Sequence, residues 1–316
     1  MDNGRRRLPC PVPLTCFSSD RYTAPLPPGH VFPMSKFAES AAAVRADPRC
    51  TVIDPGLIGD GELLRVHTPA YVESIRTGAY NEVTALKLGL PWSPQLALRS
   101  RAATAGTLAA ARIALADGMA CNLAGGTHHA FPDRGEGFCV FNDVAVAIRA
   151  LQVDDPWYHL MVVDLDAHQG NGTHFIFAGD SRVFTYSVHG GRNYPSKKVP
   201  GTMDVELPRW VEPAEYFERL EATLPGAVEG FEPDLVFYIA GADVHVDDRF
   251  GQMRLTTADV RRRDEWTIRL CRQWGIPVVV TYGGGYNTTP GMTARLHVQT
   301  VEVAAEIVAA ERTAAP

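Results

Sequence analysis

The stretch that decides the fold reads Leu160-Met161-Val162-Val163-Asp164-Leu165-Asp166-Ala167-His168. Its first half is a short run of large apolar residues, which is typical of a strand buried on both faces of a parallel sheet. Its second half places two carboxylates and an imidazole at alternate positions directly after that run. Residues two apart in extended backbone point the same way, so the side chains of Asp166 and His168 could meet one ion.

Three further apolar runs follow the same pattern, at residues 183–187, 235–239 and 277–281. Each ends in polar or glycine-rich sequence, with the letters SVHGG, AGAD and YGGGY respectively. In open α/β sheets, ligands bind outside the carboxyl ends of the strands. We therefore expect the four endings to converge on one crevice.

Helical segments separate these runs. The clearest covers residues 97–118, which are rich in alanine and leucine and end on a glycine, and others are expected at 213–223, 257–273 and 292–312. The sequence predicts an α/β fold in which residues 1–316 form a single domain, with an open, mostly parallel sheet flanked by helices. Residues 24–30 are expected to be loop, and about the first 20 residues a flexible segment.

Composition narrows the class of protein. Hydrophobic residues make up 46% of the chain and charged residues 21%, as in a soluble globular protein with a substantial core. The net charge of −6 predicts no direct binding to a nucleic-acid backbone. We expect no membrane span and no signal peptide, because no apolar run is long enough. The six cysteines form no CxxC pair, so we expect reduced thiols and a cytoplasmic location; the sequence leaves the oligomeric state open.

A metal site is the simplest use of the acidic strand ending. Asp166 and His168 need a third ligand from another strand end, and Asp243 is the best candidate. Three protein ligands plus water make an open catalytic site, whereas a structural zinc site takes four ligands and usually cysteines. The alternative is that these acids cap helices or loops.

Two other features suggest catalysis. His128 and His129 follow a glycine pair, and adjacent histidines can supply a base for water and an acid for a leaving amine. Tyr286 follows three glycines, which would allow a close approach to a ligand and present its hydroxyl to a developing oxyanion. The alternatives are ordinary core or surface histidines and a turn with a packing tyrosine.

Together these motifs resemble the arginase-like zinc deacetylases, the histone deacetylase family, from about residue 25 to residue 310. The resemblance is carried by GGTHHA at 125–130, GFCVFND at 137–143, DLDAHQGNGT at 164–173, AGAD at 240–243 and GGGY at 283–286. The letters QGN at 169–171, with FPM at 32–34, are most similar to the class IV branch and its bacterial relatives.

The resemblance implies a role for each motif residue. Zn(II) would be bound by Asp166, His168 and Asp243. His129 would be the main proton-transfer residue and His128 would help electrostatically, while Tyr286 would polarise the scissile carbonyl.

It also implies supporting and substrate-contacting residues. Asp164 would orient His128, and Asn171 would be the partner of His129, where many relatives have aspartate. Gly137 and Phe138 would line the acyl-lysine channel, with Tyr194 on its opposite wall. Family members also bind potassium, which here would involve Asp164, Asp166, His168, Ser187 and the Val188 backbone.

The expected function is zinc-dependent removal of an acyl group from an acylated lysine in a protein or from a related small amine. Metal-activated water, histidine acid–base chemistry and tyrosine oxyanion stabilisation would carry it. The acyl group could be acetyl or a longer fatty acyl, and the class IV resemblance favours long chains. Alternatives are an acetylpolyamine or small-metabolite deacylase and a non-catalytic protein that binds acylated ligands. A two-manganese ureohydrolase is disfavoured, because Gly170 stands where its pattern requires an acid.

Overall fold

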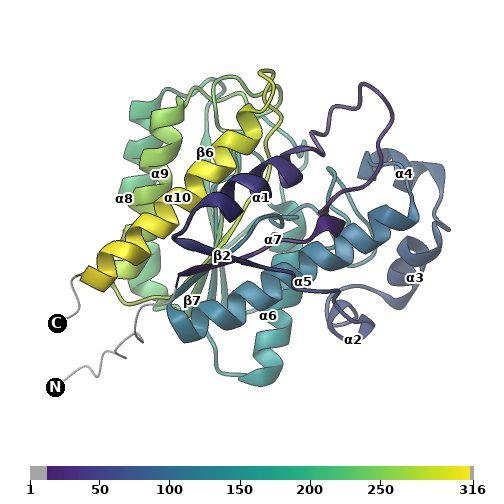
Figure 1. Ribbon diagram of the computed structural model, residues 1–316, viewed down its shortest axis with the longest axis horizontal. Helices are drawn as coiled ribbons and strands as arrows, with labels where there is room; N and C mark the ends of the chain where they lie inside the picture. Colours follow the sequence, from purple (N-terminus) through teal and green to yellow (C-terminus); the bar gives the residue numbers. More distant parts are fainter. Residues whose placement is uncertain (1–12, 314–316) are drawn as a thin grey trace.

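The central element of the fold is one open, all-parallel sheet. The computed structural model describes residues 13–313, and Figure 1 shows the sheet with helices packed around it. The strand order is β2-β1-β3-β8-β7-β4-β5-β6. The strands are β1 (Leu14–Phe17), β2 (Cys50–Ile53), β3 (Met119–Asn122), β4 (Leu160–Asp164), β5 (Val183–Gly190), β6 (Met203–Leu207), β7 (Leu235–Ile239) and β8 (Val278–Thr281). The predicted fold class is confirmed.

Ten α-helices and a short 3-10 helix surround the sheet within the described residues. They are η1 (Asp20–Tyr22), α1 (Lys36–Ala46), α2 (Asp60–Leu63), α3 (Pro69–Thr77), α4 (Glu82–Leu88), α5 (Pro94–Asp117), α6 (Asp143–Asp154), α7 (Asn171–Phe177), α8 (Pro213–Phe231), α9 (Thr257–Gln273) and α10 (Met292–Thr313). One group of neighbours runs α1, α10, α9, α8, while α5 packs on α6 and on β1, β3 and β8. None of these helices combines the length and apolar character that a bilayer crossing needs.

Local sequence explains where the longer helices begin and end. α5 begins at Pro94 after the N-cap Ser93, whose side chain accepts from Leu96 N–H, and it ends at Gly118, which has a φ of 90°. α9 spans the predicted residues and begins with a capping box between Thr256 and Asp259. α8 continues to Phe231, past Pro225, although proline ordinarily interrupts a helix.

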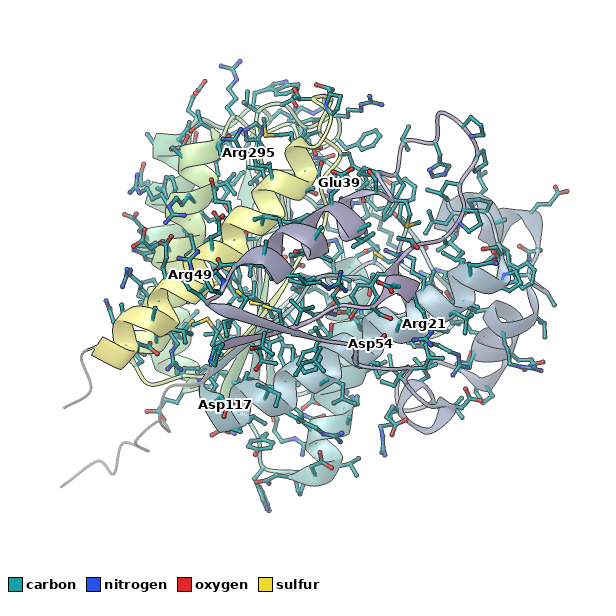
Figure 2. The ribbon with its side chains drawn as sticks, in the orientation of Figure 1. Arg21, Glu39, Arg49, Asp54, Asp117 and Arg295 are labelled. Carbon is teal, nitrogen blue, oxygen red and sulfur yellow. The ribbon has the colours of Figure 1, made fainter. Side chains whose placement is uncertain are left out.

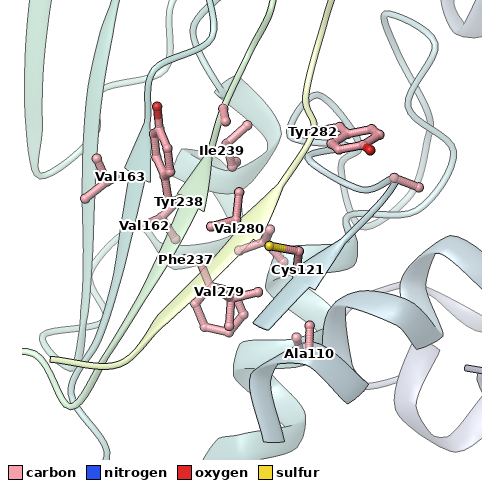
Figure 3. Close-up of a cluster of buried hydrophobic side chains, with 14 of the residues drawn as sticks. Ala110, Cys121, Val162, Val163, Phe237, Tyr238, Ile239, Val279, Val280 and Tyr282 are labelled. Atoms are coloured by element: carbon pink, nitrogen blue, oxygen red, sulfur yellow. The ribbon is translucent and has the colours of Figure 1, made fainter. Parts of the chain in front are cut away.

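Strand register brings together three of the four strand endings that were predicted to converge, whereas β5 continues to Gly190. Asp164 at the end of β4 pairs with Ile239 of β7 and with Ser187 of β5, and Ile239 pairs in turn with Thr281 of β8. The chain therefore leaves β4, β7 and β8 at the same edge of the sheet. Figure 3 shows the apolar side chains of these strands packed together behind that edge, among them Val162 and Phe237, which are at most 1% exposed.

The strands at and near the sheet edges were not anticipated. β1, β2 and β3 are only four residues long and carry polar residues, so their sequence has no periodicity that distinguishes them from loop. β6 does alternate apolar and polar residues, but over five residues only. The expectation of a flexible start is wrong for residues 14–17, because pairing with two neighbouring strands holds them in β1. Residues 1–12 lie outside the described residues.

The chain after β2, one of the two edge strands, is hydrogen-bonded to the chain that follows β1. Asp54 comes directly after β2, and its Oδ2 accepts from Ser19 Oγ at 2.9 Å and lies 3.4 Å from Arg21 Nη1. Figure 2 shows Arg21 and Asp54 at the surface, where an ion pair adds little to stability.

Candidate active site

The strand endings bring two carboxylates and one imidazole together. Asp166 and His168 follow β4 and Asp243 follows β7, and their ligand atoms all lie within 4.8 Å of one another. His168 Nδ1 is 3.1 Å from Asp166 Oδ1 and 3.0 Å from Asp243 Oδ2. All three side chains are buried. The other carboxylate oxygens are fixed by backbone, because Asp166 Oδ2 accepts from Gly284 N–H and Asp243 Oδ1 from Ala167 N–H.

The adjacent histidines form a relay between two acceptors. His128 Nδ1 lies 2.6 Å from Asp164 Oδ2, His129 Nδ1 lies 2.7 Å from Asn171 Oδ1, and the two Nε2 atoms are 3.1 Å apart. An amide oxygen only accepts, so Nδ1 of His129 carries the proton of that contact, and Nε2 is the acceptor atom of the neutral ring.

The two histidines have opposite pKa shifts. Burial lowers the pKa of His129 well below its ordinary value, and the neighbouring His128 and His168 lower it further. Burial also disfavours charge on His128, but the carboxylates of Asp164 and Asp166 outweigh this and raise its pKa to about 9. His128 is therefore the charged member of the pair and His129 the neutral one.

The glycine loop after β8 has no room for side chains. A Cβ at Gly284 would collide with the carboxylate oxygens of Asp243 and Asp166. A Cβ at Gly126 would collide with the backbone of Gly283, at 2.7 Å from its Cα and N atoms. This packing places Tyr286 beside the metal-ligand candidates, with its N–H donating to Asp248 Oδ2 at 2.6 Å. Burial raises the pKa of Tyr286 well above its ordinary value, so its phenol remains a hydrogen-bond donor.

Two cavities meet at these residues. An outer cavity of about 340 Å³ opens toward solvent and an inner one encloses about 40 Å³. Five residues line both: His129, Gly137, Phe138, His168 and Tyr286. A reacting group held between these five would extend one end into each cavity.

Two of the three sequence-predicted channel residues lie at this junction, and the third lines the outer cavity. Gly137 has a φ of 54°, and a Cβ there would collide with the His129 ring. The Phe138 ring lies 5.5 Å from that of Tyr286, centroid to centroid. Tyr194 lines the outer cavity, with its ring 4.8 Å from that of His129.

Comparison with known proteins identifies the family, because the model of the histone deacetylase domain matches residues 30–302. The chain belongs to the histone deacetylase family. It is 40% identical over 268 residues to an uncharacterized protein of Picosynechococcus, covering 84% of this chain and 89% of the relative. It is 29% identical over 269 residues to histone deacetylase 2 of Arabidopsis thaliana, covering 81% and 70% respectively.

Solved structures agree on the fold. The crystal structure of the HDA15 HD domain superimposes with a TM-score of 0.76 at 24% identity, covering 95% of this chain and 93% of that one. At this sequence identity, the structural similarity supports the fold and nothing further. Membership of the histone deacetylase family supports deacetylase activity.

The residues expected to hold potassium are neighbours in this deacetylase-family fold. Asp164 of β4 pairs in register with Ser187 of β5, and Val188 follows in the same strand. Ser187 is buried, and its Oγ lies 2.9 Å from His189 Nδ1. Asp164 Oδ1 accepts from Asp166 N–H at 3.1 Å, which turns the chain toward the metal-ligand candidates.

Sequence reasoning missed the residues that hold the ligand loops from behind. Arg263 of α9 is fully buried, and its Nη1 donates to Leu165 O at 3.1 Å and to Gly241 O at 2.7 Å. Those carbonyls belong to the loops that carry Asp166 and Asp243. In the sequence Arg263 is one of three consecutive arginines in a helix, which is typical of a solvated face.

Two buried cations of the inner cavity were also missed. Lys36, the first residue of α1, and Arg99 of α5 are 2% and 4% exposed, and both line this cavity. The role of Asp143, within the GFCVFND motif, was not predicted either; its carboxylate accepts from Gly126 and Thr127 N–H and so fixes the turn before the histidines. No local pattern distinguishes Lys36 or Arg99 from surface residues.

Proposed function

We propose that this chain is a zinc-dependent deacylase that hydrolyses the amide of an acylated lysine or a related acylated amine. The observation that carries the proposal is the junction of the two cavities at His129, His168 and Tyr286. An amide held there would lie beside a metal-ligand group, a neutral imidazole and a phenol donor. That combination suits hydrolysis of a C–N bond.

The ligand candidates fit zinc. Carboxylate and imidazole are both ligand types that zinc accepts, and three protein ligands leave a position open for catalysis. Within residues 13–313, no lysine or arginine forms an ion pair with Asp166 or Asp243, so their buried charge calls for a cation. When bound, zinc would polarise the substrate carbonyl and lower the pKa of a water.

The histidines would move the proton and stabilise charge. His129, which is neutral and has Nε2 as its acceptor atom, would accept the proton of the attacking water. His129 would then return that proton to the departing amine. His128, which Asp164 contacts through Nδ1, would stabilise the negative charge that develops nearby. Tyr286 would donate its hydroxyl proton in a hydrogen bond to the oxyanion.

Cavity size bears on the acyl group. A cavity needs roughly 10–15 Å³ to hold one water molecule. The inner cavity of about 40 Å³ therefore has room for only a few atoms, which suits acetyl or another short acyl group. It does not favour the long chains that the class IV resemblance suggests. Placement in class IV itself remains our prediction, as does a potassium ion bound by Asp164, Asp166, His168, Ser187 and the Val188 carbonyl.

The outer cavity favours an acyl-lysine over an acetylated polyamine. Lys87 lines it, and no acidic residue is among its described lining residues. The free ammonium groups of a polyamine would need carboxylate partners there. A lysine stem is apolar, and Phe138, Tyr194 and Phe250 offer it aromatic walls.

The test is release of a fluorophore from an acetyl-lysine peptide by the full chain, as purified, after chelation, and after zinc is added back. We expect activity to disappear on chelation and to return with zinc. Binding of the peptide without release, in zinc-loaded protein, would indicate instead a non-catalytic protein that recognises acylated ligands.

A further inference from the structure

The floor of the inner cavity carries two positive charges. Lys36 Nζ lies 5.4 and 5.3 Å from the ring centroids of Phe32 and Phe37, and Arg99 Cζ lies 5.5 and 4.7 Å from the same two centroids. Both cations therefore lie against the same two aromatic rings, and Lys36 Nζ is also 5.8 Å from the ring centroid of Tyr286. Both side chains are more than nine-tenths buried.

Neither cation has a carboxylate partner in the described part of the chain. Lys36 Nζ donates only to Gly283 O, at 3.4 Å, and Arg99 Nε donates to Tyr22 O, at 3.0 Å. The two terminal nitrogens of Arg99 make no hydrogen bond there. Buried charges are ordinarily paired, because burial without a partner costs several kcal/mol.

The electrostatics of the cavity agree with a missing anion. Burial lowers the pKa of Lys36 to about 8, with Arg99 contributing, and burial lowers the pKa of Arg99 to about 10. The carboxylates that line the same cavity are Asp166 and Asp243, which are the metal-ligand candidates and would be occupied by the metal. A carboxylate from the substrate would compensate both cations at once.

We propose that Lys36 and Arg99 form a carboxylate-binding floor, and that the preferred acyl group is a short one that itself ends in a carboxylate, of malonyl or succinyl size. This rests on the proposed deacylase function and specifies its substrate class. The guanidinium fork of Arg99 can hold both oxygens of a carboxylate, and Lys36 can add a third charge-assisted contact.

The reaction itself is unchanged. Water adds its hydroxyl to the acyl carbon, the C–N bond breaks, and a proton goes to the leaving nitrogen. The products are a dicarboxylate and a free amine, and the terminal carboxylate takes no part in bond making. A monocarboxylate product would meet the same cations after any deacylation, so the test separates substrate preference from product binding.

The first experiment compares kcat/KM for one lysine peptide bearing acetyl, malonyl, succinyl and the amide-terminated isosteres of the last two. We expect each acidic acyl group to exceed its isostere by at least about tenfold, since hydrogen bonds to charged groups contribute that much. In Arg99→Met and, separately, Lys36→Met, the ratio of acidic acyl to isostere should fall toward one. Arg112→Met removes an exposed arginine from the same helix and should leave the ratio unchanged.

A second experiment measures binding without catalysis. Peptides in which a CH2 group replaces the scissile nitrogen, with an acid or an amide terminus, are titrated calorimetrically into the wild type and both methionine variants. We expect tighter binding of the acid form to the wild type only. Acetate should compete with the acid-terminated ketone peptide more than with the amide-terminated one.

Equal kcat/KM for acid and isostere, with acetyl peptide cleaved, would overturn the carboxylate floor and leave the deacylase proposal standing. Inhibition by acetate without any preference for acidic acyl groups would likewise overturn it, since the cations would then serve the product alone. If no peptide is cleaved by zinc-loaded protein, the deacylase proposal fails, and the ketone peptides still decide whether the floor binds a carboxylate.

Discussion

The metal-ligand side of the site and the floor of the inner cavity are built in different ways. Asp166, His168 and Asp243 follow buried strands, and the sheet register brings them to one edge. Lys36 and Arg99 come from helices that pack from outside the sheet, and only tertiary packing turns them inward. Site residues that follow buried strands can therefore be recognised from local sequence, whereas site residues that reach the cavity from helices cannot.

Removing a metal-ligand candidate at a strand end should have the largest effect. Asp243→Ala should reduce bound zinc and bring turnover down to the level of the chelated protein, because two remaining ligands form a weak site. Zinc per chain is measured by elemental analysis. Asp247→Ala is the matched control, since that carboxylate accepts hydrogen bonds from Thr288 and Thr289 and does not line either cavity. Full zinc content in Asp243→Ala would remove Asp243 from the site.

Arg263 tests the support behind the ligand loops. Arg263→Met leaves Asp264 buried without its main partner and two loop carbonyls without a donor, so we expect a loss of about 3–5 kcal/mol in the free energy of unfolding. Urea denaturation measures it. Arg269→Met on the same helix breaks an exposed ion pair and should cost no more than about 0.5 kcal/mol. Equal losses would show that Arg263 has no special role.

Tyr286 tests oxyanion stabilisation apart from metal binding. Tyr286→Phe keeps the ring in both cavities and removes one donor, so kcat should fall by about 10²–10³ while zinc content is unchanged. Steady-state kinetics and elemental analysis are run on the same samples. Near-normal kcat would exclude the hydroxyl from the mechanism.

Asn171→Asp should have the smallest effect, a shift in the pH dependence of kcat/KM. A base works only when unprotonated, so the lowered pKa of His129 extends activity toward low pH. Asn171→Asp would place a carboxylate 2.7 Å from Nδ1 and stabilise the protonated ring, moving the acidic limb of kcat/KM to higher pH by about one unit or more. A shift to lower pH, or none, would contradict the role of His129 as the base.

The sequence was most informative where function requires consecutive residues. The strand that ends at Asp164, the three glycines before Tyr286 and the extent of α9 all follow from local pattern. β1 could not be predicted in this way, because its four residues are ordered only by pairing with β2 and β3. Arg263 was hidden for a related reason, since a buried arginine and an exposed one look the same in a helical sequence.

The backbone of the channel wall is hydrogen-bonded to a short surface helix. Phe138 is held at a φ of 67°, a conformation that costs a non-glycine residue about 1–2 kcal/mol. Its N–H donates to Leu88 O at 2.8 Å, and Gly137 N–H donates to Lys87 O at 3.0 Å, so the wall is fastened to the last turn of α4. Leu86 in the same helix is 83% exposed. A displacement of this short surface helix would therefore move the backbone of the channel wall with it.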